Sequence, residues 1–378
     1  MKALITVASI QAESAGPSYT VPALCGGLAS NGVDVSLHVL DTVPELKRNY
    51  SVVTYERRKF PVWALGRSPE MLQGFRKTLK DCDIVHNNGI WMMPNVYPAI
   101  AKRGTNCKLV FCPRGGLSKA ALSRSRIKKF LMGHFGGQYM ALQETDMFHA
   151  ASMKELMEIR ALGYTQPIAL VPNGIDVPDI GHKPFASTNR KIAFFGRIHK
   201  TKAVDHLVAA WGNVADNFPD WSLEIAGPDC GAVPMLKKMI AERNIPRVSF
   251  VGELHGIDKY RFLASADIYV LPSLTENFGI TIAEALACGT PVIASYGCPW
   301  ERLEEKGCGW WIDIGVDALT AQLETSLTLS PEAFRGKGKK GRQWMVSEYS
   351  WDGIAKKMLS AYNWLCHGGI KPEWVYEL

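Results

Sequence analysis

Short apolar runs alternate with amphipathic stretches through the first half of the chain. Four of these runs predict strands, at residues 2–8, 33–40, 84–86 and 108–112. Between the first two, residues 19–30 have the pattern of a helix, and the following Asn31-Gly32 is a typical helix stop. Continuous Val, Ile, Leu and Phe runs separated by helices favour a parallel sheet that is covered on both faces.

The same alternation begins again after a connector. The connector VPNGIDVPD, at residues 171–179, holds two prolines, an Asn-Gly pair and two aspartates, which predicts a turn-rich link between domains. Beyond it, strands are expected at 191–195, 221–226, 248–251 and 268–272, and helices at 203–214, 233–243 and 258–264. We therefore expect an α/β protein with two Rossmann-like, doubly wound domains that face each other across a cleft.

Candidate chemistry follows the predicted strand 268–272. The stretch SLTENFGITIAEALACGTPVIAS, residues 273–295, places Glu276 and Glu284 on either side of a predicted helix start. Ligands of open α/β sheets bind beyond the carboxyl ends of the strands, and a helix start offers unpaired N–H groups to phosphate. Four backbone amides could hold a diphosphate there, those of Phe278, Gly279, Ile280 and Thr281. Glu284 could accept hydrogen bonds from ribose hydroxyls, and Glu276 from a sugar, although either carboxylate alone could be a solvated surface group.

A second group of residues lies in FFGRIHKTKAV, residues 194–204. Gly196 turns the chain after a strand, and Arg197 and Lys202 follow it. Two fixed cations beside a diphosphate could stabilise the charge on a departing phosphate, as a metal ion does elsewhere. The alternative is two surface cations in a polar loop.

The net charge, the apolar runs and the cysteines narrow the kinds of partner and compartment that the chain suits. The net charge of +7 is too mild to indicate nucleic acid, and no apolar run approaches the roughly 20 residues that span a bilayer. Nine cysteines without ligand spacing and a brief, strand-like N-terminus are typical of a cytoplasmic protein with reduced thiols and no structural zinc. Asp81-Cys82-Asp83 could hold Mg²⁺ or Mn²⁺, but its position favours a polar helix-to-strand turn, and we expect no metal site.

The E-x7-E pair of Glu276 and Glu284, together with FGR-x4-K, resembles the retaining family-4 glycosyltransferases of GT-B fold. The resemblance covers nearly the whole chain and includes PNGID at 172–176 and AGPD at 226–229. CPRGGLS at 112–118 and GCGWWID at 307–313 resemble a branch that builds bacterial surface polysaccharides. The resemblance implies an N-terminal acceptor-side domain at 1–176, a nucleotide-sugar domain at 177–357, and a helix at 358–378 that returns to the first domain.

The resemblance also implies roles at matching positions. Glu276 would contact the donor sugar, Glu284 would hold the ribose, and Arg197 and Lys202 would neutralise the diphosphate that the 278–281 amides bind. Leu254 would lie near the plane of the base, and Gly16 would let its loop approach the diphosphate.

The chain departs from the family pattern at three places, which are Ala15-Gly16, Ala203 and Cys112-Pro113-Arg114. Because many members have a histidine at the last of these, the first-domain contact to the reacting sugar is open. Arg114 is the first candidate. His86, at a strand end, is the second, and it could equally be bonded within the sheet.

The activity implied is retaining, metal-independent transfer of a hexosyl unit from a UDP- or GDP-linked sugar to a hydroxyl of a growing, lipid-linked bacterial polysaccharide such as O-antigen or capsule. No further cofactor is expected. A basic amphipathic segment at 118–131 suits a peripheral position on the anionic inner face of the cytoplasmic membrane. Its cations are Lys119, Arg124, Arg126, Lys128 and Lys129. The alternatives are a solvated helix face with a soluble sugar acceptor, and a non-catalytic nucleotide-sugar-binding subunit.

Overall fold

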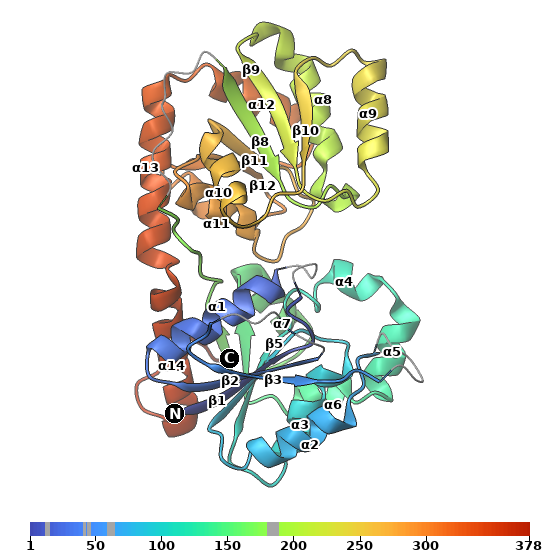
Figure 1. Cartoon of the computed structure of the whole chain (residues 1–378), viewed down its shortest axis with the longest axis vertical. Helices are drawn as coiled ribbons and strands as arrows, with labels where there is room; N and C mark the ends of the chain where they lie inside the picture. The colour runs from blue at the N-terminus through green and yellow to red at the C-terminus, as the bar shows by residue number, and fades with distance from the viewer. Residues whose placement is uncertain (12–15, 41–42, 44–46, 59–64, 180–188) are drawn as a thin grey trace. The chain divides into compact units, whose positions relative to one another are not determined.

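Parallel sheets organise both halves of the chain, as a computed structural model shows (Figure 1). The structure describes residues 1–11, 16–40, 43, 47–58, 65–179 and 189–378. One unit comprises Met1–Gly174 with Trp351–Leu378, and the other comprises Ile175–Ser350. The unit boundaries thus fall at 174/175 and 350/351, a few residues before the predicted 176/177 and 357/358.

The first unit is built on an eight-stranded sheet in the order β14-β7-β6-β5-β4-β1-β2-β3. Its strands are β1 (Lys2–Val7), β2 (Asp34–Leu40), β3 (Ser51–Tyr55), β4 (Ile84–Asn88), β5 (Lys108–Cys112), β6 (Met147–Ala150), β7 (Ile168–Leu170) and β14 (Val375–Tyr376). Neighbouring strands are parallel except β14, which runs antiparallel to β7. The strand order reverses between β1 and β4, so a ligand crevice is expected at the carboxyl ends of those strands.

Helices cover both faces of this sheet. They are α1 (Pro17–Ser30), α2 (Pro69–Thr78), α3 (Tyr97–Lys102), α4 (Lys119–Ser123), α5 (Arg126–His134), α6 (Gln138–Gln143), α7 (Met153–Ala161) and α14 (Trp351–His367). Successive residues of β1 point to opposite faces. Ile5 therefore joins the core under α1 and α14, while Leu4 joins the core under α2 and α3. This two-sided burial is why residues 3–5 of the strand are apolar without interruption.

Helix α14 returns the chain to the first unit by packing on α1. Gly27 makes the close approach possible, because a Cβ built there would lie 2.9 Å from the Cβ of Ala355. Gly174 plays the same part in the connector, where a Cβ would lie 2.5 Å from the ring of Trp351. The Asn-Gly pair of the connector thus serves packing as well as turning.

The second unit holds a six-stranded parallel sheet in the order β10-β9-β8-β11-β12-β13. Its strands are β8 (Arg190–Phe195), β9 (Trp221–Ala226), β10 (Val248–Gly252), β11 (Ile268–Leu271), β12 (Val292–Ser295) and β13 (Gly309–Ile312). Its α-helices are α8 (Val204–Val214), α9 (Val233–Glu242), α10 (Gly256–Ser265), α11 (Ile280–Ala287), α12 (Val316–Leu327) and α13 (Pro331–Glu348). The strand order reverses between β8 and β11, which brings the loops after these two strands together. The predicted pair of Rossmann-like units is therefore confirmed.

No helix in the described part of the chain combines the length and the hydropathy needed to cross a membrane.

Candidate active site

The loop after β8 and the loop after β9 meet at two glycines. Gly196 has a φ of +153°, and a Cβ on Gly227 would lie 2.0 Å from the carbonyl oxygen of Gly196, so only glycine fits there. Asp229, the aspartate of AGPD, accepts hydrogen bonds from the amides of residues 231–233 at the start of α9. The bond from the Val233 amide is the main cause that holds the pKa of Asp229 below its usual range. Asp229 therefore orders the loop between β9 and α9.

The loops after β8 and β11 are joined by a half-buried ion pair. Lys202 lies in a 3₁₀ turn, Lys200–Lys202, and its ammonium group contacts Oε1 of Glu276. The same oxygen accepts a hydrogen bond from the hydroxyl of Ser273 at 2.7 Å, and the amide of Leu274 donates to the carbonyl of Thr201 at 3.0 Å. The structure thus brings together Lys202 and Glu276, which the sequence separates by 74 residues.

Arg197, predicted to act with Lys202, is placed differently. Its side chain is exposed, and no ion pair or hydrogen bond joins it to another described residue. Its charge is therefore available to a ligand at the carboxyl end of β8, whereas the charge of Lys202 is already matched by Glu276.

The predicted phosphate-binding turn begins α11. Gly279 is the N-cap residue with a φ of 78°, and no side chain caps the helix. The indole Nε1 of Trp300 donates to the carbonyl of Phe278 at 2.5 Å, and the Phe278 ring is buried against Trp300. The amides of Gly279, Ile280 and Thr281 donate no hydrogen bond outside α11 to any residue that the structure describes. These amides therefore form a rigid, uncapped helix start that suits an anion.

Glu284, one turn into α11, is buried and paired with a lysine that the sequence did not single out. Its carboxylate lies 2.6 Å from Nζ of Lys259 on α10, and the side chain of Glu284 is only 4% exposed. Burial raises the pKa of Glu284, and Lys259 partly offsets this. Burial also disfavours the charge of Lys259, but the carboxylate outweighs it and raises the pKa of Lys259. Glu284 is thus held in one position at the wall of the turn, and ribose hydroxyls would have to share it with Lys259.

Leu254 lies between β10 and α10 and is half-buried, with its side chain packed on the core of the second unit. Part of its surface stays accessible at the carboxyl edge of the sheet, where a base would be expected.

Arg114 is the centre of the polar cluster in the first unit. It follows β5 with a φ of 55°, and its guanidinium donates to Oδ1 of Asn88 at 2.7 Å and to Oδ1 of Asn173 at 2.6 Å. A longer contact of 3.4 Å reaches the hydroxyl of Thr20. All three acceptors are neutral, so the half-buried cation has hydrogen bonds that orient it while its charge stays available to an anionic or polar ligand.

His86 is buried at the end of β4 with both ring nitrogens bonded. Nδ1 lies 2.6 Å from the Tyr362 hydroxyl, and Nε2 lies 3.2 Å from Nδ1 of His149. A carbonyl can only accept, so Nε2 of His149 donates to the carbonyl of Val171, and Nδ1 of the neutral His149 ring is then an acceptor. Nε2 of His86 therefore donates to Nδ1 of His149, and Nδ1 of His86 accepts from the Tyr362 hydroxyl. Burial lowers the pKa of His86, and it lowers that of His149 to about 3. The ring therefore fits the alternative weighed above, a histidine bonded within the sheet, and not a ligand contact.

Gly16 is the N-cap residue of α1, and its carbonyl accepts from the hydroxyl of Thr20 at 3.1 Å. No atom of a described residue lies within 4 Å of a Cβ built on Gly16. Ala15, which precedes it in the departure from the family pattern, lies outside the described residues.

The basic segment is not one helix. It is broken at Ser125, which has a φ of 52°, into α4 and α5. Four side chains form an exposed apolar surface that we name the α5 face: Ile127, Phe130, Leu131 and Phe135, exposed by 78%, 55%, 50% and 80%. Four exposed cations accompany it, Lys119, Arg124, Arg126 and Lys128. Lys129 is wrongly placed in this set, because its ammonium group donates to the carbonyl of Ala121 and lies over the ring of Trp91.

The D-x-D motif forms a turn. The carboxylate of Asp83 accepts a hydrogen bond from the backbone N–H of Lys2 at 2.7 Å and fixes the start of β4 beside β1. Within the described ranges, no group of three or more His, Cys, Asp and Glu side chains could hold a metal ion.

Solved structures share this fold. Sucrose-phosphate synthase from Thermosynechococcus elongatus is 20% identical, with a TM-score of 0.77 over 97% of this chain and 100% of that chain. HepE from Anabaena, in complex with UDP and glucose, is 17% identical, with a TM-score of 0.75 over 96% of this chain and 99% of that chain. The two Rossmann-like units therefore have the GT-B fold, as the sequence predicts.

Two family models match the chain in succession. The model described as Glycosyltransferase Family 4 matches residues 15–178, and the model described as Glycosyl transferases group 1 matches residues 179–360. The chain therefore belongs to the glycosyltransferases that these two models describe. It is 27% identical over 210 residues to the phosphatidyl-myo-inositol mannosyltransferase of Mycobacterium leprae, which is 54% of this chain and 55% of that relative. The chain thus matches about half the length of this curated relative.

Proposed function

We propose that the chain transfers a hexosyl residue from a nucleotide diphosphate sugar, UDP- or GDP-linked, to a hydroxyl of a growing lipid-linked bacterial polysaccharide. The anomeric configuration is kept, and neither a metal ion nor another cofactor takes part. The observation that carries the proposal is the half-buried Lys202–Glu276 pair beside the uncapped start of α11.

The donor half of the reaction rests on the second unit. The amides of residues 279–281 receive the diphosphate, and Arg197, which has no acidic partner among the described residues, supplies the opposing charge. Glu276 lies within hydrogen-bond reach of Lys202 and Ser273, so a hexose hydroxyl that binds Glu276 is held next to a fixed cation. HepE, whose solved complex contains UDP and glucose, supports a nucleotide sugar as the donor.

The chemistry needs no covalent intermediate with the protein. The bond from the anomeric carbon to the diphosphate breaks, and the acceptor hydroxyl forms its bond on the same face of the sugar. The departing diphosphate takes the acceptor's proton. Lys202 and Arg197 stabilise the negative charge that develops on the leaving group, and the α11 amides orient it. Arg114, oriented by Asn88 and Asn173, is the first-unit group proposed to contact the reacting sugar.

The α5 face supports a lipid-linked acceptor. Four exposed apolar side chains stand beside four exposed cations, and this combination favours an anionic membrane surface. The mannosyltransferase relative, which by its name acts on phosphatidyl-myo-inositol, is consistent with such a surface. We place the protein at the inner face of the cytoplasmic membrane, bound peripherally. The sucrose-phosphate synthase neighbour keeps the alternative of a soluble acceptor open.

The test has two stages. Thermal shifts with a panel of UDP- and GDP-sugars identify the donor, and mass analysis then measures transfer to a lipid-diphosphate-linked sugar, to a free sugar, or to water. Transfer to the lipid-linked sugar that persists in EDTA is expected. Transfer only to free sugars would show that the acceptor is a soluble sugar and not a lipid-linked one. Transfer that EDTA abolishes would contradict the metal-independent mechanism. Donor binding without transfer or hydrolysis would favour the non-catalytic nucleotide-sugar-binding subunit.

A further inference from the structure

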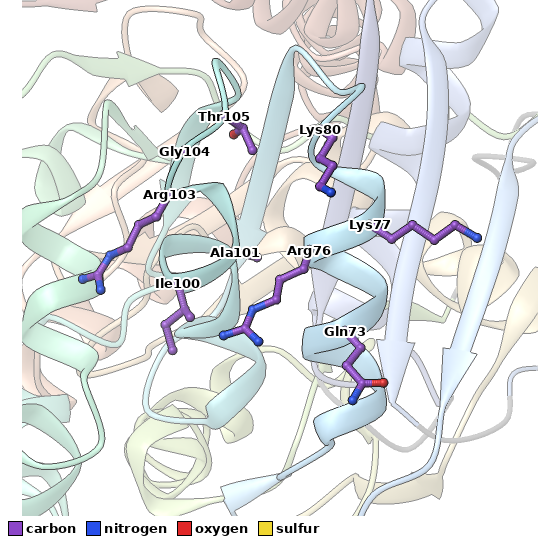
Figure 2. A pocket seen from close by; sticks show the side chains of 9 residues that line it. All are labelled: Gln73, Arg76, Lys77, Lys80, Ile100, Ala101, Arg103, Gly104 and Thr105. Atoms are coloured by element: carbon purple, nitrogen blue, oxygen red, sulfur yellow. The ribbon is translucent and has the colours of Figure 1, made fainter.

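A second positively charged site lies in the first unit, away from the carboxyl ends of its strands. A pocket of about 580 Å³ opens between α2 and α3, and the turn at Gly104-Thr105 forms one of its ends (Figure 2). Both helices lead into β4 and β5, so the pocket lies near the amino ends of those strands. Arg114 follows the opposite end of β5. The pocket is therefore separate from the polar cluster around Arg114.

The lining is cationic. Arg76, Lys77, Lys80 and Arg103 line the pocket, and no aspartate or glutamate does. Figure 2 shows Arg76 pointing towards Ile100 on α3 and Lys80 lying above it, between α2 and Thr105, whereas the side chain of Lys77 extends from α2 in the direction opposite to Arg76. Arg76 and Lys80 are thus the two charges directed into the space.

On the α3 side of the pocket, the nearby acidic side chains are already paired with cations. Glu144 pairs with Arg103 at 2.5 Å, and Asp146 pairs with Lys102. In the part of the chain that the structure describes, no ion pair reaches Arg76, Lys77 or Lys80. Cations in the last turn of a helix are favoured by its dipole, which accounts for Arg76 and Lys77. It does not account for Lys80, which lies beyond α2, or for the concave shape.

The uncharged residues that line the pocket narrow the kind of anion that it can bind. Only Ile100 and Ala101 are aliphatic and no aromatic ring is present, so the pocket offers neither a stacking surface for a base nor a channel for an acyl chain. Gln73 adds an amide that can bond to hydroxyls or phosphate oxygens. An arginine fork beside a lysine matches the geometry and charge of phosphate groups.

We propose that this pocket binds a compact, multiply phosphorylated ligand, such as a sugar phosphate or a short polyphosphate, through Arg76 and Lys80. The ligand enters as the free anion, and the site takes no part in sugar transfer.

The test is calorimetric titration of the full chain with inorganic pyrophosphate at low and at physiological salt. The Arg197→Ala chain is titrated in parallel, so that the proposed donor site contributes less. The double variant Arg76→Gln/Lys80→Gln should weaken pyrophosphate binding by about ten-fold or more in both backgrounds. Lys77→Gln is the matched control, because it removes one charge from the same helix with a side chain that extends in the direction opposite to Arg76. It should change the affinity less than about two-fold.

Several outcomes would overturn the proposal: pyrophosphate affinity unchanged in the double variant, an equal loss in Lys77→Gln, or no binding at all. A second arm uses phosphatidylglycerol vesicles. If the double variant lost vesicle binding and kept pyrophosphate binding, the pocket would be a lipid headgroup site instead. Because Arg76, Lys77 and Lys80 have no proposed role in sugar transfer, the effect of substituting them on pyrophosphate binding is independent of whether transfer itself is detected.

Discussion

The ammonium group of Lys202 and a carboxylate oxygen of Glu276 form an ion pair in which the side chains are only 17% and 12% exposed. The pair connects the two loops at which the strand order of the second unit reverses. A sugar hydroxyl arriving at Glu276 would therefore meet an acid whose position is already fixed by a cation and by Ser273. The predictions below start from this arrangement.

Glu276→Gln should reduce transfer by about 100-fold or more, because the amide keeps the shape and loses the charge that orients the sugar and Lys202. Initial rates with the donor found by thermal shift would measure this. Glu224→Gln is the control, since Glu224 forms a 2.9 Å ion pair with Lys191 on the same sheet. A near-native rate for Glu276→Gln, with Glu224→Gln equally active, would remove Glu276 from the site.

Lys259→Met should lower the free energy of unfolding by about 3 kcal/mol, because it leaves the buried carboxylate of Glu284 without its cation. Urea denaturation would measure the loss. Adding Glu284→Gln to this variant should recover most of it. Lys356→Met, which breaks a pair that is 63% exposed on both sides, should cost no more than about 0.5 kcal/mol. Equal effects of the two lysine variants would contradict the burial argument.

Stability should fall as the pH drops below about 6.5. The folded-state pKa values of His86 and His149 are lowered by burial, to about 3 for His149, whereas an unfolded histidine titrates near 6.5. Between these values only the unfolded chain binds the protons, so each histidine removes about 1.4 kcal/mol per pH unit, and the stability is fully present above the unfolded pKa.

Urea denaturation between pH 7.5 and pH 5 would test this dependence. His149→Asn should make the slope shallower, because it removes a buried histidine whose pKa is lowered. A slope in His149→Asn equal to that of the native chain would show that His149 does not stay neutral.

Ile127→Ser/Phe130→Ser should weaken binding to anionic vesicles by about ten-fold or more, because it removes apolar surface that would enter the bilayer interface. Co-sedimentation with phosphatidylglycerol vesicles would measure this. Met157→Ser/Leu162→Ser removes two exposed apolar side chains from the region of α7 and should leave binding unchanged. Equal losses in the two variants would mean that the α5 face is not the contact.

The sequence predicts the long-range plan of the fold because its buried strands are continuously apolar. β5 and β9 have the predicted bounds, because a proline directly follows the first and a glycine directly follows the second. β6 and β7 were missed because a strand of three or four residues does not show a period. β13 was missed because its GWWI was used as a family signature and not as a strand.

Within the site, local motifs are visible in the sequence and their partners are not. Glu284 follows from its spacing to Glu276, but Lys259 lies 25 residues away on another helix, and no pattern links the two. Likewise, Asn173 belongs to the recognised PNGID connector, yet its bond to Arg114 exists only in the folded unit. Lys129 shows the converse, since a basic amphipathic pattern does not reveal which cation turns inwards.

The chain enters and leaves the second unit at a single place. The amide of Ile175 donates to the carbonyl of Tyr349 at 2.8 Å, and Ile175 is bridged to Ser350, so the two ends of Ile175–Ser350 lie side by side. On the other side of both junctions, Gly174 packs against Trp351. Replacing residues 175–350 with the corresponding piece of another member would therefore need only two adjacent splice points, and it would leave the unit that carries the α5 face unchanged.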